Sequence, residues 1–108
     1  GDPIILDLVQ LGLGDDGHTA SLIPNDPVLQ VADRDTAWSE NYKGHRRMTL
    51  TYPCINRARE ILWLIAGDDK REAVAQVLAK DHSIPGGSIA QEQATLYLDQ
   101  AAAANIDA

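Results

Sequence analysis

The feature that most constrains the fold is a regular alternation of short apolar stretches with helical or turn segments. Three stretches have the length and composition of strands, namely residues 4–13, 61–66 and 94–99. The first two are almost continuously apolar, which predicts strands buried on both faces. A helix is predicted over residues 69–80, with an apolar stripe formed by Ala73, Val74, Val77 and Leu78. Strands that alternate with helices predict an α/β fold, a parallel sheet covered on both faces.

Weaker signals predict several shorter elements around these three strands. They are strands over residues 37–42 and 48–51, a helix from Pro53 to about Glu60, a turn over residues 83–88, and a last helix beginning over residues 101–104. Asp69 and Glu72 have the spacing of a capping box at the start of the predicted helix.

Composition and charge exclude several classes of function. The 108 residues fit one small domain, and 16 acidic against 9 basic residues give a net charge of −7, unsuited to general binding of nucleic acid or anionic membranes. Three histidines without ligand spacing and one cysteine, Cys54, predict no metal site and no internal disulfide. We therefore expect a cytoplasmic protein. Eight of the nine basic residues lie between Lys43 and Lys80, so this middle region can still hold a small anion.

The loop after the first strand carries a glycine pattern. Residues 12–17, GLGDDG, match the GxGxxG dinucleotide fingerprint. However, Pro24 and Pro27 leave room for only about two helical turns after the loop, whereas the fingerprint needs a long helix. Asp15 and Asp16 would also place carboxylates beside a pyrophosphate. We therefore expect no dinucleotide cofactor here.

The longer string LGLGDDGHTASLIP, residues 11–24, resembles the signature GxGxDGHTASLFP of the 6-phosphogluconolactonases, with Ile23 at the usual Phe. Further segments are similar to family blocks in the same order: residues 46–51 (RRMTLT), Asn56-x-Ala58-Arg59, the pair Gly67 and Lys70, and residues 97–102 (YLDQAA). Residues 85–87 (PGG) depart from the family's common PA..V. The resemblance covers essentially the whole chain.

This resemblance implies a Rossmann-like three-layer sheet, shared with sugar-phosphate deaminases and isomerases. It also implies hydrolysis of 6-phosphoglucono-1,5-lactone to 6-phosphogluconate in the pentose phosphate pathway, without a cofactor. Family members usually carry a preceding N-terminal half with a GGSTP-like segment. Residues 1–108 are therefore expected to be the C-terminal half of one domain, inactive and marginally stable until the N-terminal half, on the same or a separate chain, joins it.

Besides the lactonase and the disfavoured dinucleotide-binding module, two alternatives remain open. Glucosamine-6-phosphate deaminases share the fold but have a DGHIAFNEP-like loop, whereas residues 19–22 (TASL) match the lactonase form. The other alternative is a non-catalytic fragment that only pairs with its missing half.

Candidate site residues follow from the chemistry of lactone opening. His18 is the predicted general base on water, because an imidazole can accept and return a proton near neutral pH. Asp16 either orients His18 or caps the adjacent turn, and backbone N–H groups near Gly14 and Gly17 are candidates for an oxyanion site. Arg47, with Arg46 as its competitor, and Lys70 are the predicted phosphate ligands.

Overall fold

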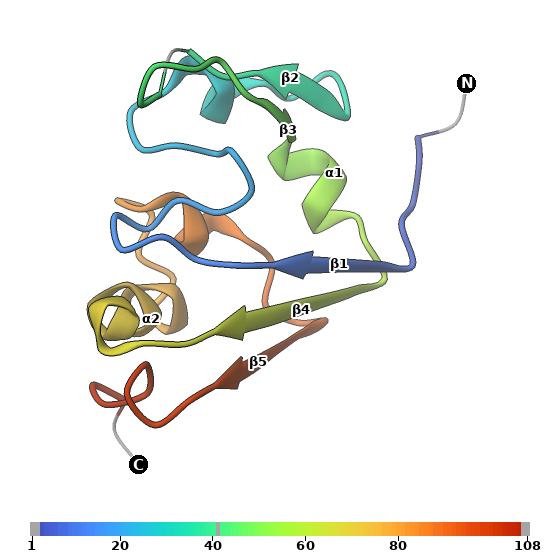
Figure 1. The fold of residues 1–108 in the computed structure, drawn as a ribbon. Coiled ribbons are helices and arrows are strands. Elements are labelled where there is room, and N and C mark those ends of the chain that lie inside the picture. Colours follow the sequence, from blue (N-terminus) through green and yellow to red (C-terminus); the bar gives the residue numbers. More distant parts are fainter. Residues whose placement is uncertain (1–2, 41, 107–108) are drawn as a thin grey trace.

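A computed structural model describes residues 3–40 and 42–106, and its centre is a three-stranded parallel sheet in the order β1-β4-β5 (Figure 1). The strands are β1 (Leu8–Leu11), β4 (Glu60–Ile65) and β5 (Ala94–Leu98). Leu8 pairs with Glu60, and Ile61 pairs with Ala94. The α/β class and the three predicted strands are confirmed. β1 is shorter than predicted, since Ile4 and Ile5 precede the paired segment and are exposed.

The helical segments are short. They are α1 (Tyr52–Asn56), α2 (Arg71–Leu78) and the 3-10 segments η1 (Pro27–Gln30), η2 (Asp68–Lys70) and η3 (Pro85–Ser88). The helix predicted from Pro53 ends at Asn56, because β4 already begins at Glu60. The helix predicted over residues 69–80 divides into η2 and α2.

Two smaller predictions are wrong. No side chain caps the first turn of α2, so Asp69 and Glu72 form no capping box. Residues 101–104 form turns rather than a helix. There the Asp99 carboxylate accepts the N–H of Ala102 at 2.8 Å and both its oxygens lie 3.1–3.2 Å from the N–H of Gly67. Asp99 thus ties the end of β5 to the end of β4.

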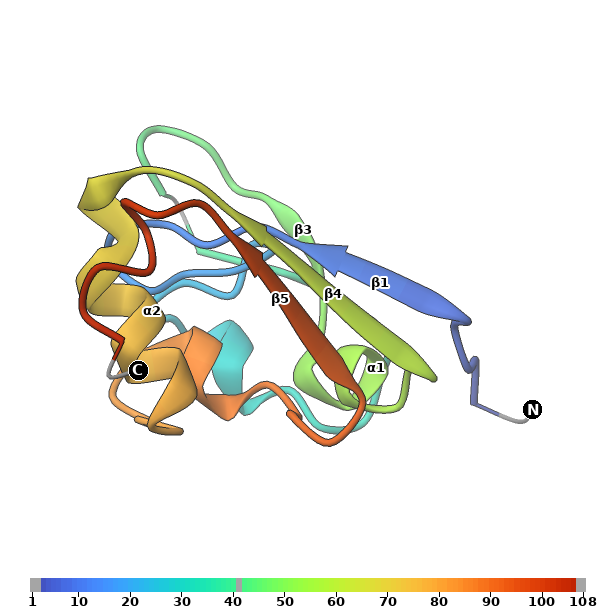
Figure 2. The same cartoon turned by 90° about the horizontal axis from the view of Figure 1, so that it is seen from below.

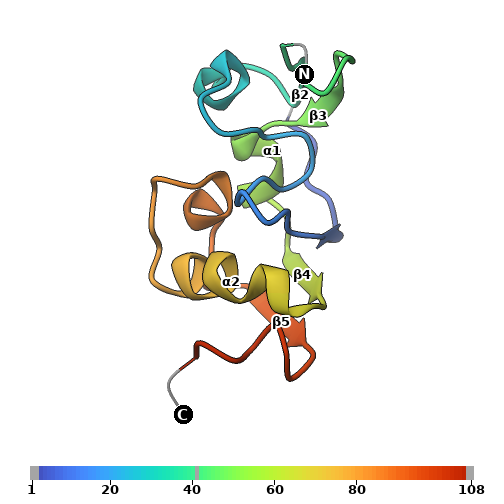
Figure 3. The same ribbon diagram turned by 60° about the vertical axis from the view of Figure 1, so that its left-hand side comes forward.

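A two-stranded antiparallel hairpin is formed by β2 (Thr36–Trp38) and β3 (Met48–Leu50). The second strand matches the prediction. The first begins one residue earlier than predicted and ends at Trp38, and Asn41, within the predicted strand, lies outside the described residues. The hairpin lies beyond α1 and the loop after β1, away from the main sheet (Figures 1 and 3).

The core lies on one side of the sheet. Alternate side chains of β1 and β4 are buried there, including Val9, Ile61 and Trp63, and they join Val74 and Val77 of α2 in one cluster. Figure 2 shows α1, α2 and η3 on this side. No helix in the described part of the chain is long and apolar enough to cross a membrane.

The opposite face of the sheet is open, and the prediction of cover on both faces is wrong for the described residues. Leu8 and Leu64 on this face are 51% and 46% exposed, and Tyr97 is 61% exposed. The apolar stretches therefore contain residues of two kinds, those that build the core and those that lie on an apolar surface in contact with water.

Candidate active site

The loop of residues 12–24 leaves the carboxyl end of β1, the edge of a parallel sheet where ligands commonly bind. Internal hydrogen bonds fix its shape: the Gly14 N–H donates to the His18 carbonyl at 2.8 Å, and Thr19 and Leu22 exchange backbone bonds at 3.4 and 2.9 Å. The buried Thr19 hydroxyl donates to the Gly12 carbonyl at 2.7 Å. Thr19 is therefore a structural residue of the loop.

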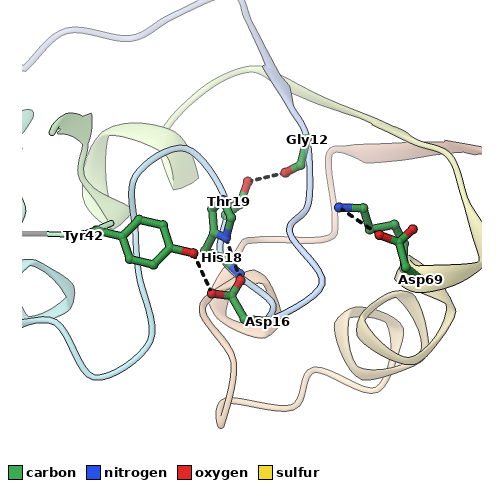
Figure 4. A network of polar contacts seen from close by, with 7 residues as sticks. Gly12, Asp16, His18, Thr19, Tyr42 and Asp69 are labelled. Carbon is green, nitrogen blue, oxygen red and sulfur yellow. Dashed lines mark hydrogen bonds and ion pairs between the residues drawn. The ribbon is translucent and has the colours of Figure 1, made fainter. Parts of the chain in front are cut away.

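Asp16 and His18 form a close pair at the turn of this loop (Figure 4). Asp16 Oδ1 lies 2.6 Å from His18 Nδ1 and accepts the His18 backbone N–H at 3.0 Å. Asp16 Oδ2 accepts the hydroxyl of Tyr42 at 3.2 Å. Asp16 thus contacts the His18 imidazole and also caps the backbone of this turn, at the His18 N–H.

The pKa of Asp16 is lowered from its ordinary value. Partial burial acts to raise this pKa, but hydrogen bonds from the His18 backbone, the imidazole and the Tyr42 hydroxyl outweigh it. A carboxylate that is ionised at neutral pH accepts a hydrogen bond from Nδ1–H, and in that tautomer Nε2 keeps its lone pair. This geometry suits His18 to the role of a base.

The two glycines shape the loop through their backbone bonds and their lack of a side chain. The Gly14 N–H is bonded to the His18 carbonyl, and the Gly17 N–H donates to the Gly14 carbonyl at 3.0 Å. These two N–H groups are therefore engaged within the turn, and an oxyanion site formed by N–H groups near them stays a prediction. A Cβ at Gly14 would collide with the His18 imidazole, and one at Gly17, where φ is +89°, would collide with Ile84. The glycines make room for the imidazole and for the packing of the loop.

A hollow of about 200 Å³ opens beside His18. Its walls come from two segments, the loop after β1 and the connection between β2 and β3; they are His18, Ala20, Ser21, Ile23, Tyr42, Lys43 and Arg47. The Ser21 N–H donates to Thr49 Oγ1 of β3 at 3.0 Å and so joins the two segments. The His18 imidazole and the cationic side chains of Lys43 and Arg47 therefore face one small cavity.

The structure separates the two neighbouring arginines. Arg47 lines the hollow, and its guanidinium carbon lies 5.7 Å from the centre of the Tyr42 ring. Arg46 instead stacks on Trp38 at 5.1 Å, and its Nε lies 3.4 Å from the Ser39 carbonyl. Of the two candidates, Arg47 is the one beside His18.

Lys70 does not line this hollow. It lies at the end of η2, after the carboxyl end of β4, and so at the same edge of the sheet as the loop that holds His18 (Figure 1). Its Nζ is 4.0 Å from Asp69 Oδ2, and its side chain is 24% exposed. Lys70 therefore lies at the same sheet edge as the His18 loop but outside the lining of this hollow.

Sequence reasoning missed Tyr42 and Lys43. The signal that could have found them is the tetrapeptide YKGH, since a glycine in a two-residue connection favours a tight hairpin turn. In the described part of the chain, no three His, Cys, Asp or Glu side chains are grouped to hold a metal ion.

The chain is similar to known proteins in both sequence and structure. A family model described as glucosamine-6-phosphate isomerases/6-phosphogluconolactonase matches residues 2–98. A 6-phosphogluconolactonase from a Nostoc species is 46% identical over 101 residues, covering 91% of this chain and 42% of that protein. The human 6-phosphogluconolactonase is 36% identical over 110 residues, covering 95% of this chain and 43% of that protein.

A solved structure agrees with these relatives. The 6-phosphogluconolactonase from Leishmania guyanensis superimposes with a TM-score of 0.84 at 29% identity, and the match covers 96% of this chain and 43% of that one. The chain therefore spans less than half the length of the relatives that it matches.

Proposed function

This chain belongs to the family of glucosamine-6-phosphate isomerases and 6-phosphogluconolactonases, and on that premise we propose that its site hydrolyses 6-phosphoglucono-1,5-lactone to 6-phosphogluconate. The observation that carries the proposal is the Asp16–His18 pair, 2.6 Å apart, beside a hollow that Arg47 also lines. The 6-phosphogluconolactonase names of the Nostoc and human relatives support it.

In the proposed mechanism His18 acts through Nε2. This atom accepts a proton from a water molecule, whose oxygen forms a bond to the lactone carbonyl carbon. The bond from that carbon to the ring oxygen then breaks, and the imidazolium returns the proton to the ring oxygen as it leaves. Asp16 keeps Nδ1 protonated and stabilises the transient imidazolium. All atoms of the product come from the lactone and water.

The phosphate of the substrate is assigned to cationic side chains. Arg47 offers a planar fork beside His18, which suits bidentate binding of phosphate oxygens. Lys70 contributes positive charge from the end of the neighbouring strand, where it is only partly balanced by Asp69 at 4.0 Å. We propose both as substrate-binding residues.

The proposed partner is the N-terminal half of the same domain. Two observations support it: the relatives are more than twice as long as the matched part, and the open face of the sheet exposes Leu8, Leu64 and Tyr97. Apolar side chains gain free energy when a partner covers them, about 25 cal/mol per Å². We also propose a cytoplasmic location, since the lone Cys54 suits a reducing compartment.

The test compares two reactions and two states of the chain. Purified chain is assayed alone, and after mixing with the N-terminal part of the Nostoc relative, for acid release from the lactone and ammonia release from glucosamine 6-phosphate. We expect acid release only, and only in the mixture. Ammonia release would favour the deaminase, and no turnover of either substrate in a stable complex would reject the proposal.

A further inference from the structure

Tyr42 lies at the start of a tight turn at the rim of the hollow. Its backbone exchanges two hydrogen bonds with His45, at 2.8 and 3.2 Å, which closes a two-residue connection. Both residues in between have positive φ angles, 52° at Lys43 and 89° at Gly44. This is the geometry of a type I′ turn, which is unusual for a lysine and fixes the direction of the chain.

Besides the adjacent Lys43, the Tyr42 side chain contacts three other residues of the site. Its hydroxyl donates to Asp16 Oδ2 at 3.2 Å, and its ring centre lies 5.7 Å from that of His18 at an interplanar angle of 63° (Figure 4). The Arg47 guanidinium lies over the same ring. One side chain thus touches the carboxylate, the proposed base and the proposed phosphate ligand.

The two oxygens of Asp16 have separate partners. Oδ1 faces His18 through its backbone N–H and Nδ1, whereas the donor to Oδ2 among the described residues is the Tyr42 hydroxyl. Without that second anchor the carboxylate, whose side chain is 36% exposed, can rotate away from the imidazole toward water. The Tyr42 hydroxyl therefore helps to hold the Asp16 carboxylate in its hydrogen bond with His18 Nδ1.

We propose that Tyr42 is a positioning residue, which holds the Asp16 carboxylate in the plane that keeps the proton of neutral His18 on Nδ1 and leaves Nε2 free. Its consequence for catalysis rests on the proposed function, but its effect on the imidazole does not. The nitrogen that carries the proton is set by the hydrogen bond that the ring makes.

The primary test reads the tautomer of His18 directly. The chain is labelled with ¹⁵N-histidine, with the unlabelled N-terminal half added if it is needed to keep the chain monodisperse. Imidazole nitrogen shifts are recorded at about pH 9, above the usual range for histidine protonation. The His18 signals are assigned by their absence in His18→Gln.

In Tyr42→Phe the ratio of the Nδ1–H to the Nε2–H tautomer should fall roughly three- to tenfold. This fold-change corresponds to the net free energy of one hydrogen bond. Tyr42→Leu, which also removes the ring, should lower it at least as far. Tyr52→Phe removes a tyrosine hydroxyl that donates to the Pro85 carbonyl at 3.2 Å rather than to Asp16; it is the matched control and should leave the ratio unchanged. Equal ratios in the wild type and both Tyr42 variants would overturn the proposal.

A second readout separates this inference from the proposed function. In the active assembly, Tyr42→Phe should lower kcat roughly three- to tenfold with little change in KM, since the ring and its contact with Arg47 remain. If the assembly has no lactonase activity but the tautomer ratio falls, the proposed function fails and the positioning role stands. If kcat and the tautomer ratio both stay at wild-type values, the positioning role is wrong.

Discussion

The two walls of the hollow are built in different ways. The wall formed by residues 12–24 is anchored in the interior: Leu22 and Thr19 are buried, and several internal bonds close the loop. The wall formed by residues 39–47 is a surface hairpin connection. Ser39 and Arg47 pair across its base, where the Ser39 N–H donates to the Arg47 carbonyl at 2.7 Å, and the Glu40 N–H donates to Asp26 Oδ2 at 2.9 Å.

The two walls therefore suit different requirements of the proposed reaction. Proton transfer needs atoms placed within a fraction of an ångström, and that requirement falls on the rigid wall with His18. Charge attraction acts over longer distances and tolerates movement, and that requirement falls on the exposed wall with Lys43 and Arg47. Changes in the rigid wall, or in the Tyr42 hydroxyl that contacts it, should therefore lower kcat, and changes in the cationic side chains of the surface wall should raise KM.

The largest effect is expected at His18. In His18→Ala the loss of the general base should lower kcat/KM by about 100- to 10,000-fold without unfolding the chain. His82→Ala, an exposed histidine whose Nδ1 contacts Ser88 instead, is the control and should retain activity. Steady-state kinetics on the active assembly measure the ratio, and equal kcat/KM in wild type and His18→Ala would remove His18 from the mechanism.

A smaller effect is expected at Gly14, because its substitution removes no side chain that takes part in the proposed reaction. The added Cβ of Gly14→Ala collides with the His18 imidazole, which must turn away from Asp16. We expect kcat to fall by about 10- to 100-fold while KM changes little. Gly12→Ala is a sharp control in the same loop, since a Cβ there meets nothing within 4 Å. Similar losses in both variants would mean that the loop is sensitive to any substitution.

The surface wall should respond in KM. Arg47→Ala should raise KM for the phosphorylated lactone by about tenfold and leave kinetics on unphosphorylated gluconolactone unchanged. Arg46→Ala, which removes the stacking on Trp38 rather than a group at the hollow, should leave both substrates unaffected. Equal losses on the two lactones in Arg47→Ala would indicate a structural role for this residue.

The rigid wall was also the predictable one. A strand followed by glycines and a histidine is a local pattern, and the site residues Asp16 and His18 lie two positions apart, so their contact depends on a single turn. The contact of Tyr42 with Asp16 spans 26 positions and depends on how the hairpin packs. No periodicity in one sequence specifies such a distance, which is why Tyr42 and Lys43 were missed.

The same reason explains the errors in the fold. The apolar stretches predicted the three strands, but their composition could not distinguish a face covered by this chain from one left open, such as that of Leu64. The alanines at residues 101–104 favour a helix locally. The Asp99 carboxylate nevertheless accepts N–H groups from two segments and holds the chain in a turn.

The smallest expected effect concerns the pH dependence of stability at the rigid wall. Because the folded state lowers the pKa of Asp16, its carboxylate stabilises the fold above the ordinary aspartate value of about 3.9, and this contribution is lost as the pH falls through the lower folded value. The gap in unfolding free energy between wild type and Asp16→Asn should therefore be widest near neutral pH. It should close at more acidic pH.

The measurement is a series of urea unfolding curves from pH 7 down to about pH 2.5, recorded for wild type and both aspartate variants. Asp15→Asn, an exposed neighbour, corrects for the loss of one negative charge in the same turn. Because the Asp16 side chain is about a third exposed, solvent screening keeps its contribution small. A gap that stays constant or widens toward acid would mean that the contacts with His18 and Tyr42 do not stabilise the carboxylate.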